Sequence, residues 1–203
     1  GDYDVRAEFI RYLALGGCED CRLHEKGLMI VGARINDTLD LEGGELPRDL
    51  GLFDCRFDSE LVFRSAKLQS LFLRGSFLLL GLRADRLETK GDIFLQGVEA
   101  HGTVRLLGAK LGGELSCTGA KFNGAKDDDG KPTGFAFSAD GLEAKGNIFL
   151  DRVEAHGAVR LPGTKLGGDL SCTGAKFNGA KDGEGRPTGD AFSADGLEAK
   201  GTF

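Results

Sequence analysis

The chain has 203 residues, of which 33 are glycine, 4 are proline and 40% are apolar, and it contains no tryptophan. This composition excludes a collagen-like or intrinsically disordered chain and indicates many sharp turns between short apolar segments. The net charge of −6 disfavours direct nucleic-acid binding, and no apolar run is long enough to span a membrane. Five cysteines are too few for a disulfide scaffold, so we expect a cytoplasmic protein.

Residues 4–15 are predicted to form one helix, which Asp2 or Asp4 can cap and Gly16-Gly17 ends. Spacings of three and four place five apolar residues on one face: Val5, Phe9, Ile10, Tyr12 and Leu13. We expect residues 1–26 to form this helix and a connector that together cover the first coil of a repeat domain, because solenoid ends need caps. Binding of a partner helix or of a membrane is the alternative role.

The connector contains the pattern Cys18-x-x-Cys21-x-x-His24. Two thiolates and an imidazole can hold Zn²⁺, but a structural site needs a fourth ligand, and no second cysteine pair follows. We therefore interpret these three residues as packing or turn residues, expect no cofactor, and retain Cys18, Cys21 and His24 as the candidate ligands of a metal. Cys55, Cys117 and Cys172 fall on inward positions of the repeat and are predicted to be small core residues.

Residues 27–203 are built from repeats. Leu87–Gly141 and Leu142–Gly196 are two copies of a 55-residue unit that match at 43 positions. Inside each unit, apolar residues recur in steps of five or six residues, and we denote the central inward residue of each step i. Of 28 such positions 27 are apolar, and position i−2 is apolar in 25. Residues two apart point the same way only in an extended chain, so each step is a very short strand.

Position i+2 is glycine in 19 of the 28 steps, which predicts a corner with positive φ after each strand. A unit holds eight steps, so a coil with four sides brings equivalent residues into register. On one side the i−1 charges then alternate in sign, and we call this column the Glu/Lys ladder: Glu45, Lys67, Glu88, Lys110, Glu143, Lys165 and Glu198. The predicted fold is an all-β solenoid of about seven coils, roughly 34 Å long at about 4.8 Å per coil.

Segments such as Ala66-Lys67-Leu68, Ala109-Lys110-Leu111 and Ala120-Lys121-Phe122 resemble the Ala-x-Leu/Phe core of pentapeptide-repeat proteins. The resemblance covers about residues 28–203 and implies a right-handed quadrilateral β-helix. The chain departs from that family by its frequent six-residue steps and by bulky residues at many i−2 positions. Some pentapeptide-repeat proteins are DNA mimics that bind type II topoisomerases, and similar bacterial sequences are labelled membrane-associated oxidoreductases.

Two insertions, near 125–134 and 180–189, follow Phe122 and Phe177 and are predicted to leave the same corner two coils apart. Their acidic residues are candidate contact residues: Asp127, Asp128, Asp129, Asp182 and Glu184. Clustered acids on loops can bind Ca²⁺, but the spacing lacks the ligand set of an EF-hand loop. We interpret the insertions as solvated loops that can also serve as binding elements.

Outward positions of the repeat carry aromatic, histidine and arginine columns. Phe72, Phe94 and Phe149 share one side, and Phe72 is predicted to stack on Phe94 in the next coil. Exposed aromatics on a flat sheet indicate a contact patch, unless the insertions or a neighbouring molecule cover them. His101 and His156 lack a predicted pocket or orienting partner and are interpreted as surface residues. Arg83, Arg105 and Arg160 form a sparse basic line on another side.

The pattern favours a non-catalytic interaction or scaffold protein that binds a protein partner of unknown identity. A DNA mimic that binds a type II topoisomerase is the alternative, although the alternating charges weaken it. An enzyme, or an accessory domain of a membrane-associated oxidoreductase, is the third hypothesis. We also expect a homodimer through the C-terminal coil, with Leu197 and Phe203 as contact residues, unless further coils follow.

Overall fold

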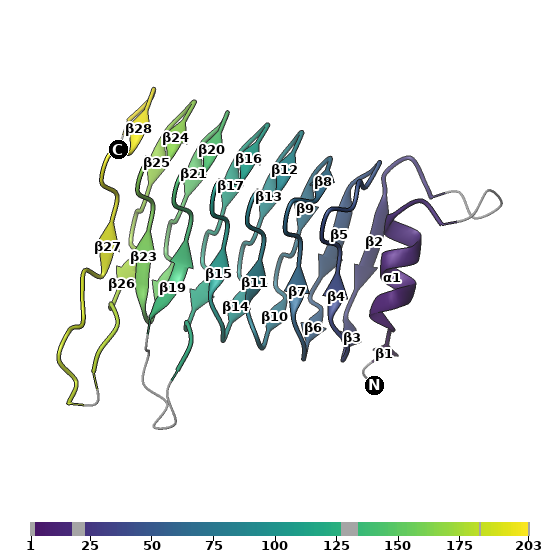
Figure 1. Ribbon diagram of the computed structural model, residues 1–203, viewed down its shortest axis with the longest axis horizontal. Coiled ribbons are helices and arrows are strands. Elements are labelled where there is room, and N and C mark those ends of the chain that lie inside the picture. The colour runs from purple at the N-terminus through teal and green to yellow at the C-terminus, as the bar shows by residue number, and fades with distance from the viewer. Residues whose placement is uncertain (1–2, 18–22, 127–133, 183, 203) are drawn as a thin grey trace.

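The computed structural model describes residues 3–17, 23–126, 134–182 and 184–202. It is a four-sided β-solenoid with one short helix, α1 (Ala7–Ala14), at its N-terminal end (Figure 1). The expected all-β class, the four sides and the helical cap are confirmed. The expected seven coils are a slight overestimate, since the smallest sheet has six strands and the solenoid makes about six turns.

Each side of the solenoid is a parallel sheet, in which every strand pairs with its equivalents one coil before and one coil after. Sheet A contains β1 (Tyr3–Asp4), β3 (Ala33–Ile35), β6 (Arg56–Phe57), β10 (Phe77–Leu78), β14 (Glu99–Ala100), β18 (Lys121–Phe122), β22 (Glu154–Ala155) and β26 (Lys176–Phe177). Sheet B contains β2 (Leu28–Val31), β5 (Leu50–Phe53), β9 (Leu71–Phe72), β13 (Ile93–Phe94), β17 (Leu115–Ser116), β21 (Ile148–Phe149) and β25 (Leu170–Ser171).

The chain passes from sheet B to A, then to C and D, before the next coil begins. Sheet C contains β4 (Leu39–Asp40), β7 (Leu61–Val62), β11 (Leu82–Arg83), β15 (Val104–Arg105), β19 (Phe135–Ser138), β23 (Ala158–Arg160) and β27 (Phe192–Ser193). Sheet D contains β8 (Lys67–Leu68), β12 (Glu88–Thr89), β16 (Lys110–Leu111), β20 (Glu143–Ala144), β24 (Lys165–Leu166) and β28 (Glu198–Ala199). A bridge from Glu45 to Lys67 extends sheet D by one coil. Because the chain visits the four sides in the order B, A, C and D, sheet A lies opposite sheet D and sheet B lies opposite sheet C across the core.

The predicted register is confirmed at every rung of the Glu/Lys ladder. Each ladder residue pairs with the next one along sheet D, from the Glu45 bridge to Glu198 in β28. The inward positions are buried in the middle coils, and those that are only partly buried lie in the first and last coils: Ile30, Cys172, Phe177, Ala194 and Ala199. The core is therefore one continuous apolar column along the solenoid axis.

Large and small side chains offset one another within a coil, as close packing requires. The coil that contains Phe122 stacks this ring on Phe137 with centroids 5.4 Å apart, and Ala139 and Ala144 complete it. In the preceding coil Ala100 occupies the position of Phe122, so the large ring lies directly over a small residue. This alternation lets two phenylalanines fit inside one narrow coil.

The corners are of two kinds, which corrects the expectation of positive φ at every i+2 glycine. Every described corner after sheets B and C has positive φ, including four that lack glycine: Asp54, Ser65, Arg86 and Arg152. None of the corners after sheet D has positive φ. Glycine is needed there for close approach instead, since an ideal Cβ on Gly113 would lie 1.9 Å from the Asp92 Oδ1 atom.

The helix differs from the prediction in its length, its cap and its buried face. Asp4 belongs to β1, which pairs with β3, and Arg6 is the N-cap without a side-chain cap hydrogen bond. The helix packs beside β4 and buries Ala7, Ile10 and Ala14. The predicted apolar face is therefore wrong in part, because two of its aromatic members are exposed to solvent: Phe9 and Tyr12. No described helix is both long and apolar enough to cross a lipid bilayer.

Candidate interaction surfaces

A column of phenylalanines on the outer face of sheet B is the clearest aromatic feature of the surface. Phe72 and Phe94 pair in adjacent strands, and their rings stack with centroids 5.3 Å apart, as predicted. Phe53 extends the column, with its ring centroid 6.0 Å from that of Phe72. The sequence pattern missed Phe53 because it occupies position i+1, whereas Phe72 and Phe94 occupy position i−1.

The column continues as apolar surface to the edge strand β2. Met29 pairs with Gly51 and is 43% exposed, and Val31 pairs with Phe53 and is 69% exposed. We call the five residues Met29, Val31, Phe53, Phe72 and Phe94 the aromatic band. The three phenylalanines are partly buried by one another, so the band offers ordered apolar surface rather than isolated exposed rings.

A small depression of about 440 Å³ adjoins the aromatic band at Phe53 and is also lined by Arg74, Gly75 and Gln96. The Oε1 atom of Gln96 is buried and accepts no hydrogen bond from any described residue. A buried acceptor without a donor is costly, so this atom has most to gain from a donor brought by a ligand. The depression therefore adds a polar edge, lined by Arg74 and Gln96, to the apolar surface of the band.

Phe149 does not belong to the aromatic band. Ser116 lies between them on sheet B, where it pairs with Phe94 on one side and Phe149 on the other. Ser116 is itself buried, so it interrupts the aromatic surface with a short polar residue. The three predicted aromatic contact residues thus divide into a stacked pair and a single ring.

The two insertions leave the corner between sheets A and C, after β18 and after β26, as predicted (Figure 1). That corner does not border sheet B, so the insertion roots lie away from the aromatic band. In the second insertion the Asp182 carboxylate accepts hydrogen bonds from the backbone N–H groups of Glu184 and Arg186, both at 2.9 Å. Asp182 is therefore a turn residue, and Glu184 forms an exposed ion pair with Arg186. Asp127, Asp128 and Asp129 lie outside the described residues.

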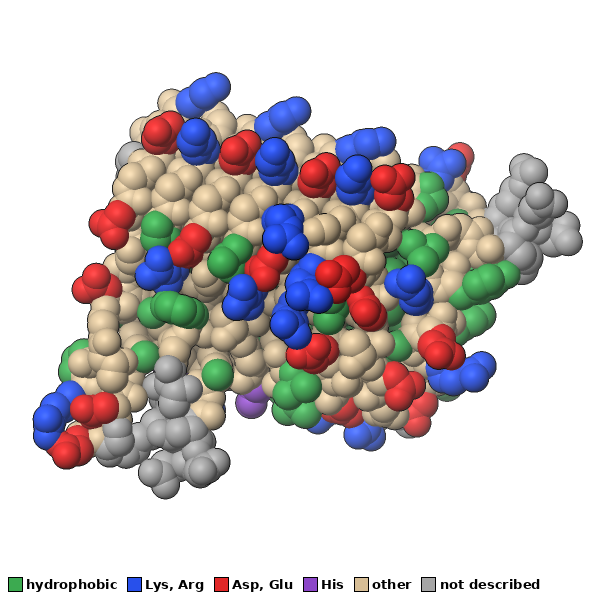
Figure 2. All heavy atoms as spheres, in the orientation of Figure 1, with side chains coloured by type: hydrophobic (Ala, Val, Ile, Leu, Met, Phe, Trp, Pro, Cys, Tyr) green, Lys and Arg blue, Asp and Glu red, His purple; other side chains and the backbone are tan. Residues whose placement is uncertain are grey.

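The histidines lie against neighbouring glutamates, and the arginines are engaged in local ion pairs. His101 Nε2 lies 2.7 Å from Glu99 Oε1, and the equivalent distance between His156 and Glu154 is 3.4 Å. Each arginine of the basic line has an acidic partner, so sheet C presents neutralised charge, as the neighbouring basic and acidic side chains in Figure 2 show. The partners of Arg83, Arg105 and Arg160 are Glu60, Asp85 and Asp140, respectively.

The three cysteines that the structure describes pack in the core. Cys55 and Cys117 are buried and Cys172 is partly buried, and burial raises the pKa of all three thiols. Cys18 and Cys21 lie outside the described residues. His24 is exposed, and its Nδ1 atom accepts a hydrogen bond from the Lys26 backbone N–H at 3.1 Å. Within the described parts of the chain, no group of three His, Cys, Asp or Glu side chains is arranged to hold a metal.

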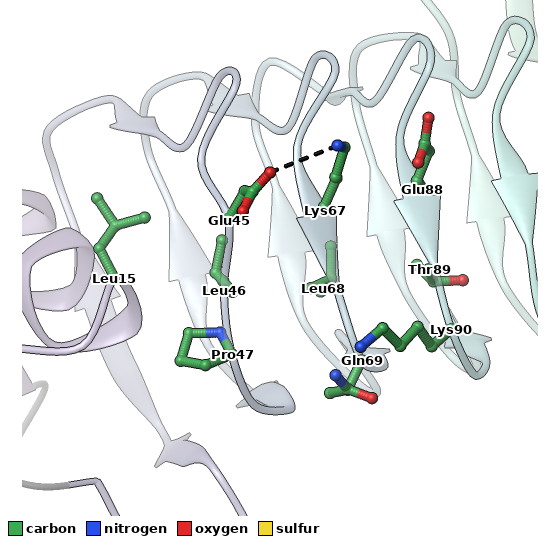
Figure 3. Close-up of a pocket in the computed structure, with 10 residues that line it drawn as sticks. All are labelled: Leu15, Glu45, Leu46, Pro47, Lys67, Leu68, Gln69, Glu88, Thr89 and Lys90. Atoms are coloured by element: carbon green, nitrogen blue, oxygen red, sulfur yellow. Dashed lines mark hydrogen bonds and ion pairs between the residues drawn. The ribbon is translucent and has the colours of Figure 1, made fainter.

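A groove follows the outer face of sheet D, opposite sheet A. Its first section has a volume of about 650 Å³ and is lined by ladder residues together with Leu15, Pro47, Gln69 and Lys90 (Figure 3). Two further sections of about 420 and 630 Å³ continue it towards Lys200, and each shares lining residues with the section before it. The walls are charged and the floor is sheet, so the groove is an extended surface rather than an enclosed pocket.

The two ends of the solenoid also carry apolar side chains. Tyr3, Phe9, Tyr12 and Leu15 are exposed beside the helix, and Leu197 in the last described coil is partly buried. Phe203 lies outside the described residues, so the homodimer through the C-terminal coil stays a prediction. The helix surface is an unpredicted exposed apolar feature, because the sequence pattern assigned Phe9 and Tyr12 to the buried face.

The geometry defines a four-sided parallel β-solenoid whose outer faces are one apolar band and several columns of paired or alternating charge. No family model matches the sequence, and no curated protein or solved structure is found to be similar to it.

Proposed function

We propose that the chain is a non-catalytic interaction scaffold that binds a protein partner through the aromatic band of sheet B. The single observation that carries this proposal is the stacked column of Phe53, Phe72 and Phe94, which continues to the exposed Met29 and Val31. Aromatic residues and methionine are enriched at protein interfaces, where they supply large contact areas at low entropic cost. A rigid solenoid holds them in place before the partner arrives, which reduces the entropy lost on binding.

The partner that fits this surface is a protein with an exposed apolar segment and a hydrogen-bond donor. Apolar contact with the band would bury the aromatic faces, and a donor would reach the buried Gln96 Oε1 only after the Gln96 side chain moves. Strand β2 is the edge strand of sheet B and carries Met29 and Val31, so an added strand is one way for the partner to dock.

The described charges give little support to the DNA-mimic hypothesis, because a mimic needs a strongly negative face. Sheet D, and sheet A from Glu99 to Lys176, alternate acidic and basic residues from rung to rung. Sheet C pairs its arginines with acids. We expect micromolar concentrations of the protein to leave gyrase supercoiling unchanged, and clear inhibition or protection would favour the mimic.

Affinity capture with matched variants tests the proposal. Immobilised wild-type chain and the Phe72→Ser/Phe94→Ser double variant are compared with Phe149→Ser, which changes the isolated ring on the same sheet. Proteins retained by the wild type and by Phe149→Ser, but lost from the double variant, would support binding through the band. Retention of the same proteins by all three would contradict it, provided that circular dichroism shows all three to be folded.

A further inference from the structure

Sheet D presents two outward columns that both alternate along the solenoid axis. One is the Glu/Lys ladder at position i−1. The second column, at position i+1, begins with the uncharged Pro47 and then alternates residues that lack a charge with lysine: Gln69, Lys90, Gly112, Lys145, Gly167 and Lys200. Coils of two kinds therefore follow one another, as Glu88 with Lys90 and then Lys110 with Gly112 illustrate. The alternating acidic and basic side chains form one long edge of the molecule in Figure 2.

Most of these charges remain available to a partner. On the described ladder only the first rung closes an ion pair, between Lys67 Nζ and Glu45 Oε1 at 3.4 Å. From Glu88 to Glu198 every ladder side chain is exposed. Sheet A also alternates glutamate and lysine from Glu99 to Lys176, but its glutamates are already engaged by His101 and His156. The two faces thus share a charge pattern, and sheet D is the one whose carboxylates are free of histidine partners.

We propose that sheet D binds sheet D of a second copy of this chain in an antiparallel, two-fold arrangement. A two-fold axis parallel to the strands reverses the order of the coils while each column still faces its own equivalent. With the axis between Lys110 and Glu143, Lys110 lies opposite Glu143 of the partner subunit, and Glu88 lies opposite Lys165 of the partner subunit. Six rungs then form pairs of opposite charge.

The i+1 column fits the same register by shape. Lys90 lies opposite Gly167 of the partner subunit, and Lys145 lies opposite Gly112 of the partner subunit. The long lysine side chains thus lie over glycines, which leave room for them, rather than against other lysines. The same antiparallel register therefore pairs opposite charges in the i−1 column and places lysines over glycines in the i+1 column.

The charge pattern restricts the antiparallel arrangement to displacements by whole pairs of coils, of which the axis between Lys110 and Glu143 and the axis between Glu88 and Lys110 each pair six rungs. An antiparallel displacement by one coil more or less places glutamate against glutamate, and like charges at an interface are destabilising. A two-fold axis along the solenoid exchanges the two columns, so Glu88 lies opposite Lys90 of the partner subunit while Lys110 and Lys165 face glycine and have no carboxylate partner. The six paired coils are about 29 Å long, but the strands of sheet D are only two residues wide, so the buried area is small and we expect weak association that salt weakens further.

Complementary charge variants test this proposal. Lys110→Glu/Lys165→Glu gives an acidic ladder, and Glu88→Lys/Glu143→Lys gives a basic one. In sedimentation velocity at low salt and high micromolar concentration, we expect the wild type to self-associate and each variant alone to be monomeric. An equimolar mixture of the two variants should regain at least the wild-type association and lose it in about 0.5 M salt. A monomeric wild type together with a mixture that does not associate would overturn the proposal.

Matched controls separate this surface from general charge attraction and from the last coil. Lys121→Glu/Lys176→Glu and Glu99→Lys/Glu154→Lys make the same charge changes on sheet A, and neither should alter association of the otherwise wild-type chain. Equal association of those two variants with each other would show general charge attraction and overturn the proposal. So would loss of dimer in Leu197→Lys together with its survival in the ladder variants, because the contact would then belong to the last coil. Thermal unfolding of every variant checks that the fold is retained.

Discussion

An ideal Cβ atom on Gly157 would lie 2.7 Å from the carbonyl oxygen of Gly134, and the φ angle of Gly157 is 136°. Both the contact and the dihedral angle exclude a β-branched side chain. We therefore expect Gly157→Val to reduce the free energy of unfolding by at least about 3 kcal/mol. Gly189→Val is the matched control, because Gly189 is exposed with no atom within 4 Å of its ideal Cβ. An unchanged urea midpoint for Gly157→Val would contradict the register of the corners.

Arg152→Gly should stabilise the protein. Arg152 is an exposed corner residue with a φ of 53°, and Gly97 occupies the equivalent corner of the preceding unit. Glycine adopts positive φ without the Cβ clash, and its greater freedom in the unfolded chain offsets part of that gain. We expect a net gain of about 0.5–1 kcal/mol in the free energy of unfolding, measured by urea denaturation. A loss of stability would show that contacts of the Arg152 side chain contribute more free energy than its positive φ angle costs.

The ladder and the aromatic pair could be predicted from the sequence because both lie on the surface of a strictly periodic chain. The side chains of Glu88 and Lys110 point outward, so their charges can differ without changing the core. The alternation of charge along the column therefore indicates the number of sides in each coil. The corner glycines could not be sorted in the same way. Gly97 is favoured by its positive φ, which Arg152 tolerates at the equivalent corner, whereas Gly113 is required by its close approach to Asp92, and a sequence shows the two causes as the same residue.

The N-terminal segment shows where periodicity stops being informative. A helix of eight residues makes little more than two turns, and packing decides which of its apolar side chains are buried. Ala7 and Ala14 allow the helix to approach the first coil closely, which leaves the larger Phe9 and Tyr12 in solvent. The two-residue strand that contains Asp4 is set by its pairing partner β3, which no local pattern predicts.

Cys117 should be the least reactive described thiol of the folded chain. It is fully buried, and burial raises its pKa well above the usual value of about 8.5, whereas Cys172 is partly exposed. Brief alkylation at pH 8 followed by mass spectrometry should modify Cys172 and leave Cys117 intact until the chain is unfolded. Rapid modification of Cys117 in the folded protein would contradict its place in the core.

The same thiol makes stability depend on pH. The Cys117 pKa is raised in the folded state, so its contribution is complete below the unfolded pKa of about 8.5 and is lost as pH rises beyond it. The free energy of unfolding should therefore fall between about pH 8 and pH 10. The fall in the free energy of unfolding should be shallower in Cys117→Ala. An equally steep fall in this variant would show that other titrating groups cause it.

Protein purified without chelator should contain little bound zinc. Elemental analysis is expected to give less than about a tenth of an equivalent, because three candidate ligands form an incomplete structural site. Cys18→Ser is the informative comparison, since it removes one candidate thiolate at a position that precedes the repeats in the sequence. A stoichiometric zinc content in the wild type that Cys18→Ser abolishes would establish a site at Cys18, Cys21 and His24.

Calorimetric titration of a captured, purified partner into the chain tests the central claim most directly, since it measures binding at the aromatic band itself. We predict that Phe72→Ser/Phe94→Ser weakens the partner's affinity at least about tenfold, because the stacked rings supply the main apolar contact. Phe149→Ser should leave the affinity within about twofold of the wild type. Wild-type affinity in the folded double variant would contradict the assignment of the band as the binding surface.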